Sequence, residues 1–375
     1  GRLGGWSTRS TAHGRRLRSG TRFGATTGRP RAAASSCCTT ATARSCATTS
    51  ATSTASASGP LTDTLAYRLS GNMHQRDGYY DNSAGDDLND ADDWNIQGKL
   101  QWEPTDSLSV LLSGSHIDRD TTCCGADAIQ SEALNNELVA QGFSPDKNDP
   151  YDYDIQPGVE SSFSMESDMA SLTIDYDIDL GEITSITAWN DYDYEVDQDP
   201  DRSQLDALAL LNDKYSGDSL SQELRFSSQA GDNIDYMVGL FYYEQTTKRG
   251  GNDPFVFIGD DFVSLANQGG FLPVPAQLIA ATDDNLVIDY KQDTETIAAF
   301  GQATWQIGEA WHLTGGLRWT DEEKTSHLFS QSNSSALGIG GIVFLDSVST
   351  PIDTTLNRST DNVDWLLRAA LDIND

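Results

Sequence analysis

The sequence contains no run of about eighteen apolar residues, so it predicts no transmembrane helix. It has only 24 basic residues against 57 acidic ones, and its net charge is −33. Nucleic acid is therefore excluded as a partner, because a chain of this charge releases few counterions from a phosphate backbone. Five cysteines in 375 residues are too few for a disulfide scaffold. These absences leave open a protein that crosses a membrane with strands, since strands of alternating polarity give no strong hydropathy peak.

Motifs of common catalytic and metal sites are also missing. The chain has no GxSxG, P-loop, HExxH or paired CxxC motif. Its five histidines are scattered along the sequence, at His13, His74, His116, His312 and His327. A Ser–His–Asp set cannot be argued from such a distribution. We therefore expect no enzyme activity, no cofactor and no metal site.

What the chain does contain is alternation. In residues 297–319, apolar or small side chains occupy every second position on both sides of a very short turn, 308–310. The positions are Ile297, Ala299, Gly301, Ala303, Trp305 and Ile307, then Trp311, Leu313, Gly315, Leu317 and Trp319. The turn has hairpin length. Each arm is about ten residues long, which is the length that a transmembrane β-strand needs.

This hairpin pattern recurs and predicts about ten strands. They are expected at 61–73, 94–102, 108–114, 169–178, 183–194, 220–226, 236–242, 297–307, 311–319 and 363–373. Tight turns and long loops alternate between them, and each strand has one apolar face for lipid and one polar face for a lumen. Outer-membrane barrels sort their connections in this way, whereas soluble sandwiches usually do not. We expect an all-β fold, an antiparallel transmembrane β-barrel segment that is an incomplete part of a larger barrel.

The N-terminal region differs from the rest. Residues 1–62 contain nine arginines and no acidic residue, and residues 1–57 have no hydrophobic period. A signal or transit peptide is one explanation, but the region lacks a continuous apolar core and is too long. We expect 1–57 to be a disordered segment, and hypothesise that it is translated in a wrong frame or is otherwise not the natural product. Residues 58–375 then form the partial barrel. Reading the DNA in its other two frames tests this hypothesis.

Several phrases in this second region resemble the barrel of TonB-dependent outer-membrane receptors, and they occur in the expected order. The phrases are 58–71, 99–114, 221–228, 236–245, 315–325 and 361–375. The resemblance implies a barrel of about 22 strands with an N-terminal plug, of which the plug and the later strands are missing here. It also implies uptake of a scarce ligand, such as a ferric siderophore, through the outer membrane of a Gram-negative cell. The TonB–ExbB–ExbD complex pulls on the plug of the full-length parent, so we expect no transport by this fragment alone.

Aromatic residues in the long loops are candidates for a ligand platform above the pore. They are Tyr79, Tyr80, Tyr151, Tyr153, Phe255 and Phe257. Such residues also pack loops against each other, and the sequence leaves both roles open. The acidic loop 191–204 offers oxygen ligands for Ca²⁺ but lacks the central Gly and terminal Glu of an EF-hand. A solvated acidic surface is the favoured reading, and divalent ions bridging this loop to lipopolysaccharide are a third.

Cys123 and Cys124 are candidates for a disulfide or redox pair. Neighbouring Cα atoms lie about 3.8 Å apart, below the usual disulfide range, so a bond between them needs an unusual geometry. Another explanation is that one of these cysteines forms a disulfide with a partner that is absent from this chain. Metal binding is disfavoured because no histidine or second cysteine pair is near in sequence.

Six tryptophans fit the aromatic girdles at the two membrane interfaces, where they would contact outer-membrane lipid. They are Trp94, Trp102, Trp305, Trp311, Trp319 and Trp365. One alternative is a soluble, secreted β-protein that stacks polysaccharide on these rings and stays in the aqueous phase without detergent. The other is a passive porin-like channel, which predicts ion conductance in a planar bilayer without plug or TonB.

Overall fold

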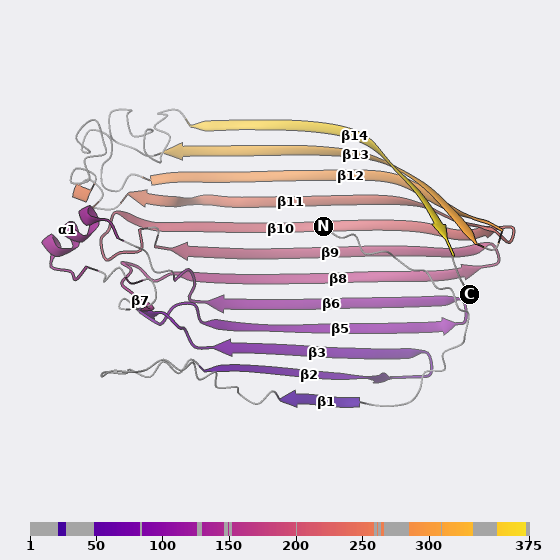
Figure 1. Cartoon of the computed structure of the whole chain (residues 1–375), viewed down its shortest axis with the longest axis horizontal. Coiled ribbons are helices and arrows are strands. Elements are labelled where there is room, and N and C mark those ends of the chain that lie inside the picture. Colours follow the sequence, from indigo (N-terminus) through magenta and orange to yellow (C-terminus); the bar gives the residue numbers. More distant parts are fainter. Residues whose placement is uncertain are drawn as a thin grey trace.

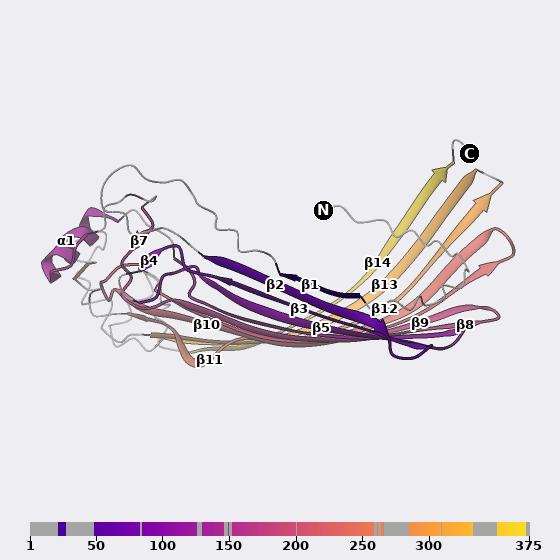
Figure 2. The ribbon, with the colours of Figure 1, turned by 90° about the horizontal axis from the view of Figure 1, so that it is seen from below.

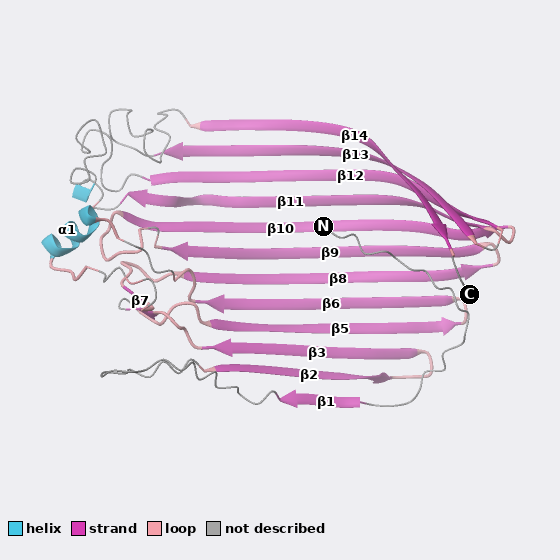
Figure 3. Cartoon of the chain, in the orientation of Figure 1, coloured by secondary structure: helices cyan, strands magenta, loops and turns pink. Residues whose placement is uncertain are grey.

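The described chain forms one large sheet of twelve strands (Figure 1). The computed structural model describes residues 22–27, 49–82, 85–125, 130–145, 149, 152–199, 201–258, 261, 264–265, 285–308, 310–332 and 351–372. Strands make up most of these residues (Figure 3). Within the described residues, no helix has both the length and the apolar character needed to cross a membrane.

Each strand of the sheet pairs antiparallel with the next one along the chain, apart from two short strands in the loops. The order is β1 (Arg22–Thr27), β2 (Ser50–Pro60), β3 (Leu65–Arg76), β5 (Ala91–Thr105), β6 (Leu108–Thr121), β8 (Ser162–Ile178), β9 (Gly181–Gln198), β10 (Leu208–Ala230), β11 (Ile234–Ile258), β12 (Asn285–Ile307), β13 (Trp311–Ser332) and β14 (Ile352–Leu371). The short strands β4 (Asp81–Asn82) and β7 (Asp154–Ile155) pair in parallel. All ten strands expected from the alternation are present.

The strands are longer than the alternation predicts. β11 has 25 residues and β10 has 23, more than twice the membrane-spanning length. Their extensions continue the backbone ladder beyond the apolar band, through residues 212–219 of β10 and 243–250 of β11, where polar residue types occupy both faces of the strand. A strand that is polar on both faces gives no period-2 signal, and the sequence pattern therefore misses it.

The connections are sorted to opposite ends of the sheet, as expected. Tight turns lie at one end, at 61–64, 106–107, 179–180 and 231–233, and Ile307 of β12 pairs with Trp311 of β13 at the same end. Long loops lie at the other end, where they include α1 (Glu132–Gln141) and β7 (Figure 1). The short helix is capped at both ends: Ser131 Oγ accepts a hydrogen bond from Leu134 N, and Gly142 adopts φ of 89°.

The cross-strand register gives the sheet two chemically different faces. Leu240 lies opposite Leu224 and Ala299 on one face, and Leu317 lies opposite Gly301 and Trp365 on the same face. We call this the apolar face, and it carries most of the large exposed hydrophobic side chains. The buried residues of the twelve-stranded sheet lie on the second, polar face: Ala91, Ser167, Thr184, Thr294, Thr296, Ala298 and Thr314. The sheet curves toward the polar face, and this curvature brings the side chains on that face closer together.

The sheet is open and strongly twisted. In Figure 2 the turn ends of β12, β13 and β14 swing away from those of β8 and β9, which is the twist that L-residues impose on strands. Among the described residues, β1 and β14 are the two edges and do not pair with each other. The structure is therefore an unclosed segment of a barrel.

The sheet also begins earlier than the sequence pattern predicts. Residues 50–57 were expected in the disordered segment, but they belong to β2, which pairs with β3 from Ser50 opposite Arg76 to Pro60 opposite Ala66. This strand consists mainly of small Ser, Thr and Ala residues, so its sequence shows no alternation of large apolar and polar side chains. Its pairing with β3 is made by the backbone and does not need such an alternation. Apart from Arg22–Thr27, residues 1–48 lie outside the described residues, and their wrong-frame origin stays a hypothesis.

Candidate functional site

The candidate site lies at the loop end of the sheet, where segments distant in sequence are joined by hydrogen bonds. Loop 122–161 contacts loop 199–207 through Gly158 N, which donates to Asp199 Oδ2 at 2.7 Å. The side chain of Gln141 in α1 donates to Asp261, whose other carboxylate oxygen accepts from Asp206 N at 2.8 Å. The loops therefore form a connected layer above the strands, and not separate arms.

Three of the predicted platform residues come together in this layer. The ring centroids of Tyr79 and Tyr80 are 5.3 Å apart, those of Tyr80 and Tyr153 are 5.2 Å apart, and those of Tyr79 and Tyr153 are 6.4 Å apart. We call these residues the tyrosine cluster. Tyr79 and Tyr153 are 43% and 48% exposed, so their rings are open to a ligand as well as to each other. Tilted and edge-to-face rings at these distances attract one another.

The backbone around the tyrosine cluster is firmly held. Leu88 is 2% exposed and its carbonyl accepts hydrogen bonds from both Tyr79 N (3.0 Å) and Tyr80 N (3.3 Å). Asp81 N donates to the Tyr153 carbonyl at 2.8 Å, next to the parallel pairing of β4 with β7. Tyr153 adopts φ of 57°, a region that non-glycine residues rarely occupy. Packing of loop against loop thus determines where the rings lie.

Arg76 adds a positive charge beside these rings. Its guanidinium carbon lies 5.4 Å from the centre of the Tyr79 ring, within the range of a cation–π contact. Arg76 Nη2 also donates to the Asn89 carbonyl at 2.8 Å, which fixes the side chain over the loop. The cluster can therefore offer an aromatic face and a cation to one ligand.

The side chains of the other three predicted platform residues lie outside the part of the chain that the structure describes. Tyr151 and the side chains of Phe255 and Phe257 are not among the described parts of the chain. Their role in a ligand platform stays a prediction. The tyrosine cluster is the part of this prediction that the structure brings together, and Arg76 is an addition that the sequence did not single out.

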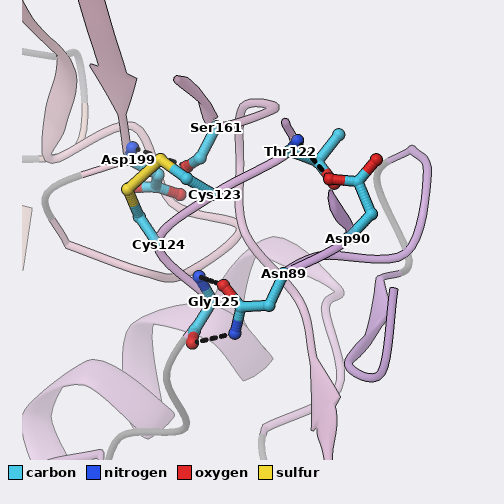
Figure 4. Close-up of a disulfide and its surroundings, with 8 residues drawn as sticks. All are labelled: Asn89, Asp90, Thr122, Cys123, Cys124, Gly125, Ser161 and Asp199. Carbon is cyan, nitrogen blue, oxygen red and sulfur yellow. Dashed lines mark hydrogen bonds between the residues drawn. A yellow bond between two sulfur atoms is a disulfide. The ribbon is translucent and has the colours of Figure 1, made fainter. Parts of the chain in front are cut away.

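The adjacent cysteines form a disulfide with each other (Figure 4). Cys123 and Cys124 are both half-buried, and Cys124 adopts φ of 69°. Cys123 N donates to the Ser161 carbonyl at 3.2 Å. The bond closes one turn of loop 122–161 and joins no second segment covalently.

Two carboxylates of the acidic loop, those of Asp199 and Asp201, bind backbone amides where the sequence predicts a solvated surface. Asp199 is 3% exposed, and its Oδ1 accepts backbone hydrogen bonds from Asp201 N (3.1 Å) and Arg202 N (3.0 Å). Asp201 in turn accepts from Ser203 N at 3.0 Å and from Ala207 N at 3.1 Å. These two side chains organise their own loop, much as Asp residues do in Asx turns. The reading as a solvated acidic surface is wrong for this part of the segment.

Burial raises the pKa of Asp199 to about 6, with repulsion from Asp201 as the second cause, although backbone donors partly oppose the shift. The folded pKa exceeds the ordinary value of 3.8, so the resulting stability is fully present below pH 3.8 and is lost as pH rises through 6. We expect loop 199–207 to open more readily at pH 8 than at pH 5, by about 1.4 kcal/mol. Hydrogen exchange of this loop, corrected for intrinsic rates, measures the change. Asp199→Asn cannot ionise and should abolish it, and equal opening at both pH values in the unmodified protein would contradict the shift.

A second aromatic group lies on the polar face and was not found from the sequence. Tyr194 and Tyr215 stack with centroids 4.7 Å apart, and the guanidinium carbon of Arg249 lies 5.3 Å from the Tyr215 ring centre. Asp213 holds Arg249 through two hydrogen bonds of 2.9 and 3.1 Å. The register places Tyr215 opposite both Tyr194 and Arg249, so only the pairing of β9, β10 and β11 brings the group together.

The six predicted girdle tryptophans all lie on the apolar face. Their exposed fractions are 41% for Trp94, 46% for Trp102, 48% for Trp305, 50% for Trp311, 45% for Trp319 and 76% for Trp365. A soluble sandwich would bury such side chains between two layers. Their contact with membrane interfaces stays a prediction.

Comparison with known families agrees with this architecture. Residues 126–365 match the family model described as TonB dependent receptor-like, beta-barrel. The chain belongs to this family. The matched range begins just after the disulfide, includes Tyr153 and ends within β14.

Solved TonB-dependent receptors share the fold. The ferric yersiniabactin uptake receptor FyuA from Yersinia pestis superposes with a TM-score of 0.62 at 17% identity, covering 87% of this chain and 43% of that chain. The closed form of the ferric-catecholate import receptor Fiu from E. coli K12 gives a TM-score of 0.61 at 14% identity, with 96% and 49% covered. The siderophore receptor PiuA from Acinetobacter baumannii gives 0.57 at 14% identity, with 87% and 46% covered.

The chain spans about half the length of these solved receptors. No curated protein matches its sequence. Membership of the family therefore establishes the barrel architecture of this chain.

Proposed function

We propose that this chain is the barrel portion of an outer-membrane receptor for TonB-dependent uptake of a scarce ligand, such as a ferric siderophore, in a Gram-negative cell. The observation that supports this most is the family match over residues 126–365, which covers most of the strands. The two faces of the sheet fit such a role. The apolar face suits contact with outer-membrane lipid, and the polar face suits a lumen that holds water or a plug.

The loop layer supplies the part of the receptor that meets the ligand. Tyr79 and Tyr153 expose ring faces, and Arg76 places a guanidinium beside them. An aromatic platform with a cation suits a bulky ligand that carries aromatic rings and negative charge, because stacking and cation–π or ionic contacts then act together. The predicted Tyr151, Phe255 and Phe257 would extend the platform.

Transport needs more than this segment. In the family that the sequence resembles, energy reaches the ligand through the plug, on which the TonB–ExbB–ExbD complex pulls. We propose that this complex is the partner of the full-length parent, and that the segment alone inserts without transporting. In the part of the chain that the structure describes, the sheet is open at β1 and β14, and an open sheet does not by itself enclose a sealed lumen.

Uptake of radiolabelled iron tests the proposal. A Gram-negative strain without its own siderophore receptors would express the full parent gene and be offered catecholate, hydroxamate and carboxylate ferric siderophores in turn. Accumulation of one class that requires TonB is the expected result. Accumulation in a strain without TonB would instead favour the passive porin-like channel, and no accumulation from any class would contradict siderophore uptake.

In the same assay, Tyr79→Ala should weaken apparent affinity for the transported complex about tenfold, because it removes an exposed ring from the platform. Tyr79→Phe keeps the ring and should stay within about twofold of the parent, since the hydroxyl is not needed for stacking. Equal loss in both variants would show that the hydroxyl matters and the ring face does not. No loss in either would exclude Tyr79 from the ligand platform.

A further inference from the structure

The disulfide lies at the centre of a short clip, residues 122–125, which fastens loop 122–161 to loop 77–90 (Figure 4). On one side of the bond, Thr122 is held by Asp90. Thr122 N donates to Asp90 Oδ1 at 2.7 Å, and Thr122 Oγ1 donates to the same oxygen at 2.9 Å. Thr122 Oγ1 also lies 3.0 Å from the Asp87 carbonyl.

On the other side of the bond, Gly125 is held by Asn89. Asn89 Nδ2 donates to the Gly125 carbonyl at 2.8 Å, and Gly125 N donates to Asn89 Oδ1 at 3.1 Å. Asn89 N donates in addition to the Thr122 carbonyl at 2.8 Å. A Cβ at Gly125 would meet Leu88 Cβ at 2.9 Å, so the two loops touch here without space for a side chain.

The segment held by the clip is the one that positions the tyrosine cluster. Leu88 precedes Asn89 and accepts the backbone hydrogen bonds of Tyr79 and Tyr80. Contacts therefore run without a gap from the disulfide through Gly125 and Asn89 to Leu88, and then to the rings.

The disulfide determines the shape of the clip. Cys124 adopts φ of 69°, a left-handed conformation that an L-residue with a Cβ avoids by about 1–2 kcal/mol. The ring that the two bonded side chains make with the backbone limits the rotation of both residues. Once the bond is broken, Cys124 can relax to negative φ, which rotates the peptide plane that carries Gly125 N away from Asn89 Oδ1.

We propose that the Cys123–Cys124 disulfide is a site of thiol–disulfide exchange that acts as a latch on the tyrosine cluster. Oxidised, it holds loop 77–90 and the rings in place; reduced, it releases them. A thiolate of an external dithiol attacks one sulfur, and the other sulfur leaves as a thiolate and takes up a proton. The second thiolate of the reductant then attacks the reductant's own sulfur in the mixed disulfide, so that the remaining cysteine sulfur leaves as a thiolate and takes up a proton. The net change is one disulfide and one dithiol giving two cysteine thiols and one oxidised reductant. The consequence for ligand binding rests on the proposed function, whereas the latch itself does not.

Hydrogen exchange with mass spectrometry tests the latch on the whole chain folded in detergent micelles. Dithiothreitol should break the bond and add two hydrogens to the mass of the peptide that contains residues 123 and 124. We expect amides in residues 79–89 to exchange at least tenfold faster after reduction, while those of β9 stay unchanged. Unchanged exchange in residues 79–89 after confirmed reduction would overturn the proposal.

Two variants separate the latch from general loosening. Cys123→Ser with Cys124→Ser should exchange like the reduced protein under all conditions. Asn89→Gly removes the side-chain contacts to Gly125 but tolerates the φ of 61° that Asn89 adopts. This variant should exchange fast even when oxidised, and reduction should add less than twofold. Slow exchange in either variant would overturn the proposal, and none of these measurements depends on whether Tyr79 binds a ligand.

Discussion

Leu240→Arg is expected to lower the stability of the folded protein in lipid vesicles by about 2–4 kcal/mol. Leu240 lies in the half of β11 next to the tight turn, is 59% exposed, and sits on the apolar face between Leu224 and Ala299. If this face contacts hydrocarbon, a guanidinium placed there loses its hydration without gaining a partner. Urea titration followed by heat-modifiable electrophoretic mobility measures the change.

Gln302→Arg is the matched control. Gln302 is exposed in the neighbouring strand β12 but lies on the polar face, opposite Met237 and Gly316. The same charge should there change stability by no more than about 0.5 kcal/mol. If both substitutions are tolerated equally, the apolar face is not in a membrane. That result would favour the alternative of a soluble, secreted β-protein that binds polysaccharide.

The strands that cross the apolar band could be predicted from the sequence because one face of each is uniformly apolar. Trp311, Leu313 and Leu317 alternate with polar neighbours in β13, and the register confirms that they share a face with Leu371, Ala369 and Trp365 of β14. The tight turns were predictable for the same reason, since they interrupt the alternation at fixed intervals.

The ends of the strands could not be predicted, because hydrogen bonding continues where the apolar signal has stopped. β11 runs on to Ile258, far beyond its last apolar-face tyrosine, Tyr242. Tyr215 and Arg249 lie in these extensions and Tyr194 at the end of its predicted strand, and only cross-strand register brings the three together. A single sequence gives the register of long polar strands only weakly.

The sequence indicated which aromatic residues lie in the loops, but it did not indicate which of them contact each other. Tyr79 and Tyr153 were recognised as loop aromatics, yet their approach depends on Leu88 and on the parallel pairing of β4 with β7. The environment of Asp199 also could not be predicted from composition. Its neighbours in sequence are acidic and predict solvent exposure, whereas the fold of the loop turns its carboxylate inward onto backbone amides.

The barrel strands and the loops are physically coupled. Strand extensions raise the loops above the apolar band, and hydrogen bonds between loops then fix the rings that a ligand would meet. The extensions depend on irregularities that keep long strands in register, such as the bulge after Gly250 in β11. This bulge therefore supports the whole loop end of β11 and β12.

Gly250→Ala is accordingly expected to destabilise the protein by more than about 3 kcal/mol. Gly250 adopts φ of 80°, and a Cβ there would lie 1.7 Å from the Ile288 carbonyl oxygen. The left-handed conformation alone disfavours alanine by about 1–2 kcal/mol. Relief of the clash requires the β12 backbone to move, which breaks the ladder between Gly250 and Asp289 and the pairing beyond it. The midpoint of urea unfolding should fall, and amides of Val287–Asp289 should lose protection from hydrogen exchange.

Gly315→Ala provides the comparison, because a methyl group at Gly315 would meet no atom within 4 Å and the residue has no positive φ. This substitution should change stability by about 0.5 kcal/mol or less. A wild-type midpoint for Gly250→Ala would mean that the bulge can rearrange without loss. The close approach of β11 to β12 would then not be what holds the loop end, and the extensions would be free to move independently of the membrane-spanning part.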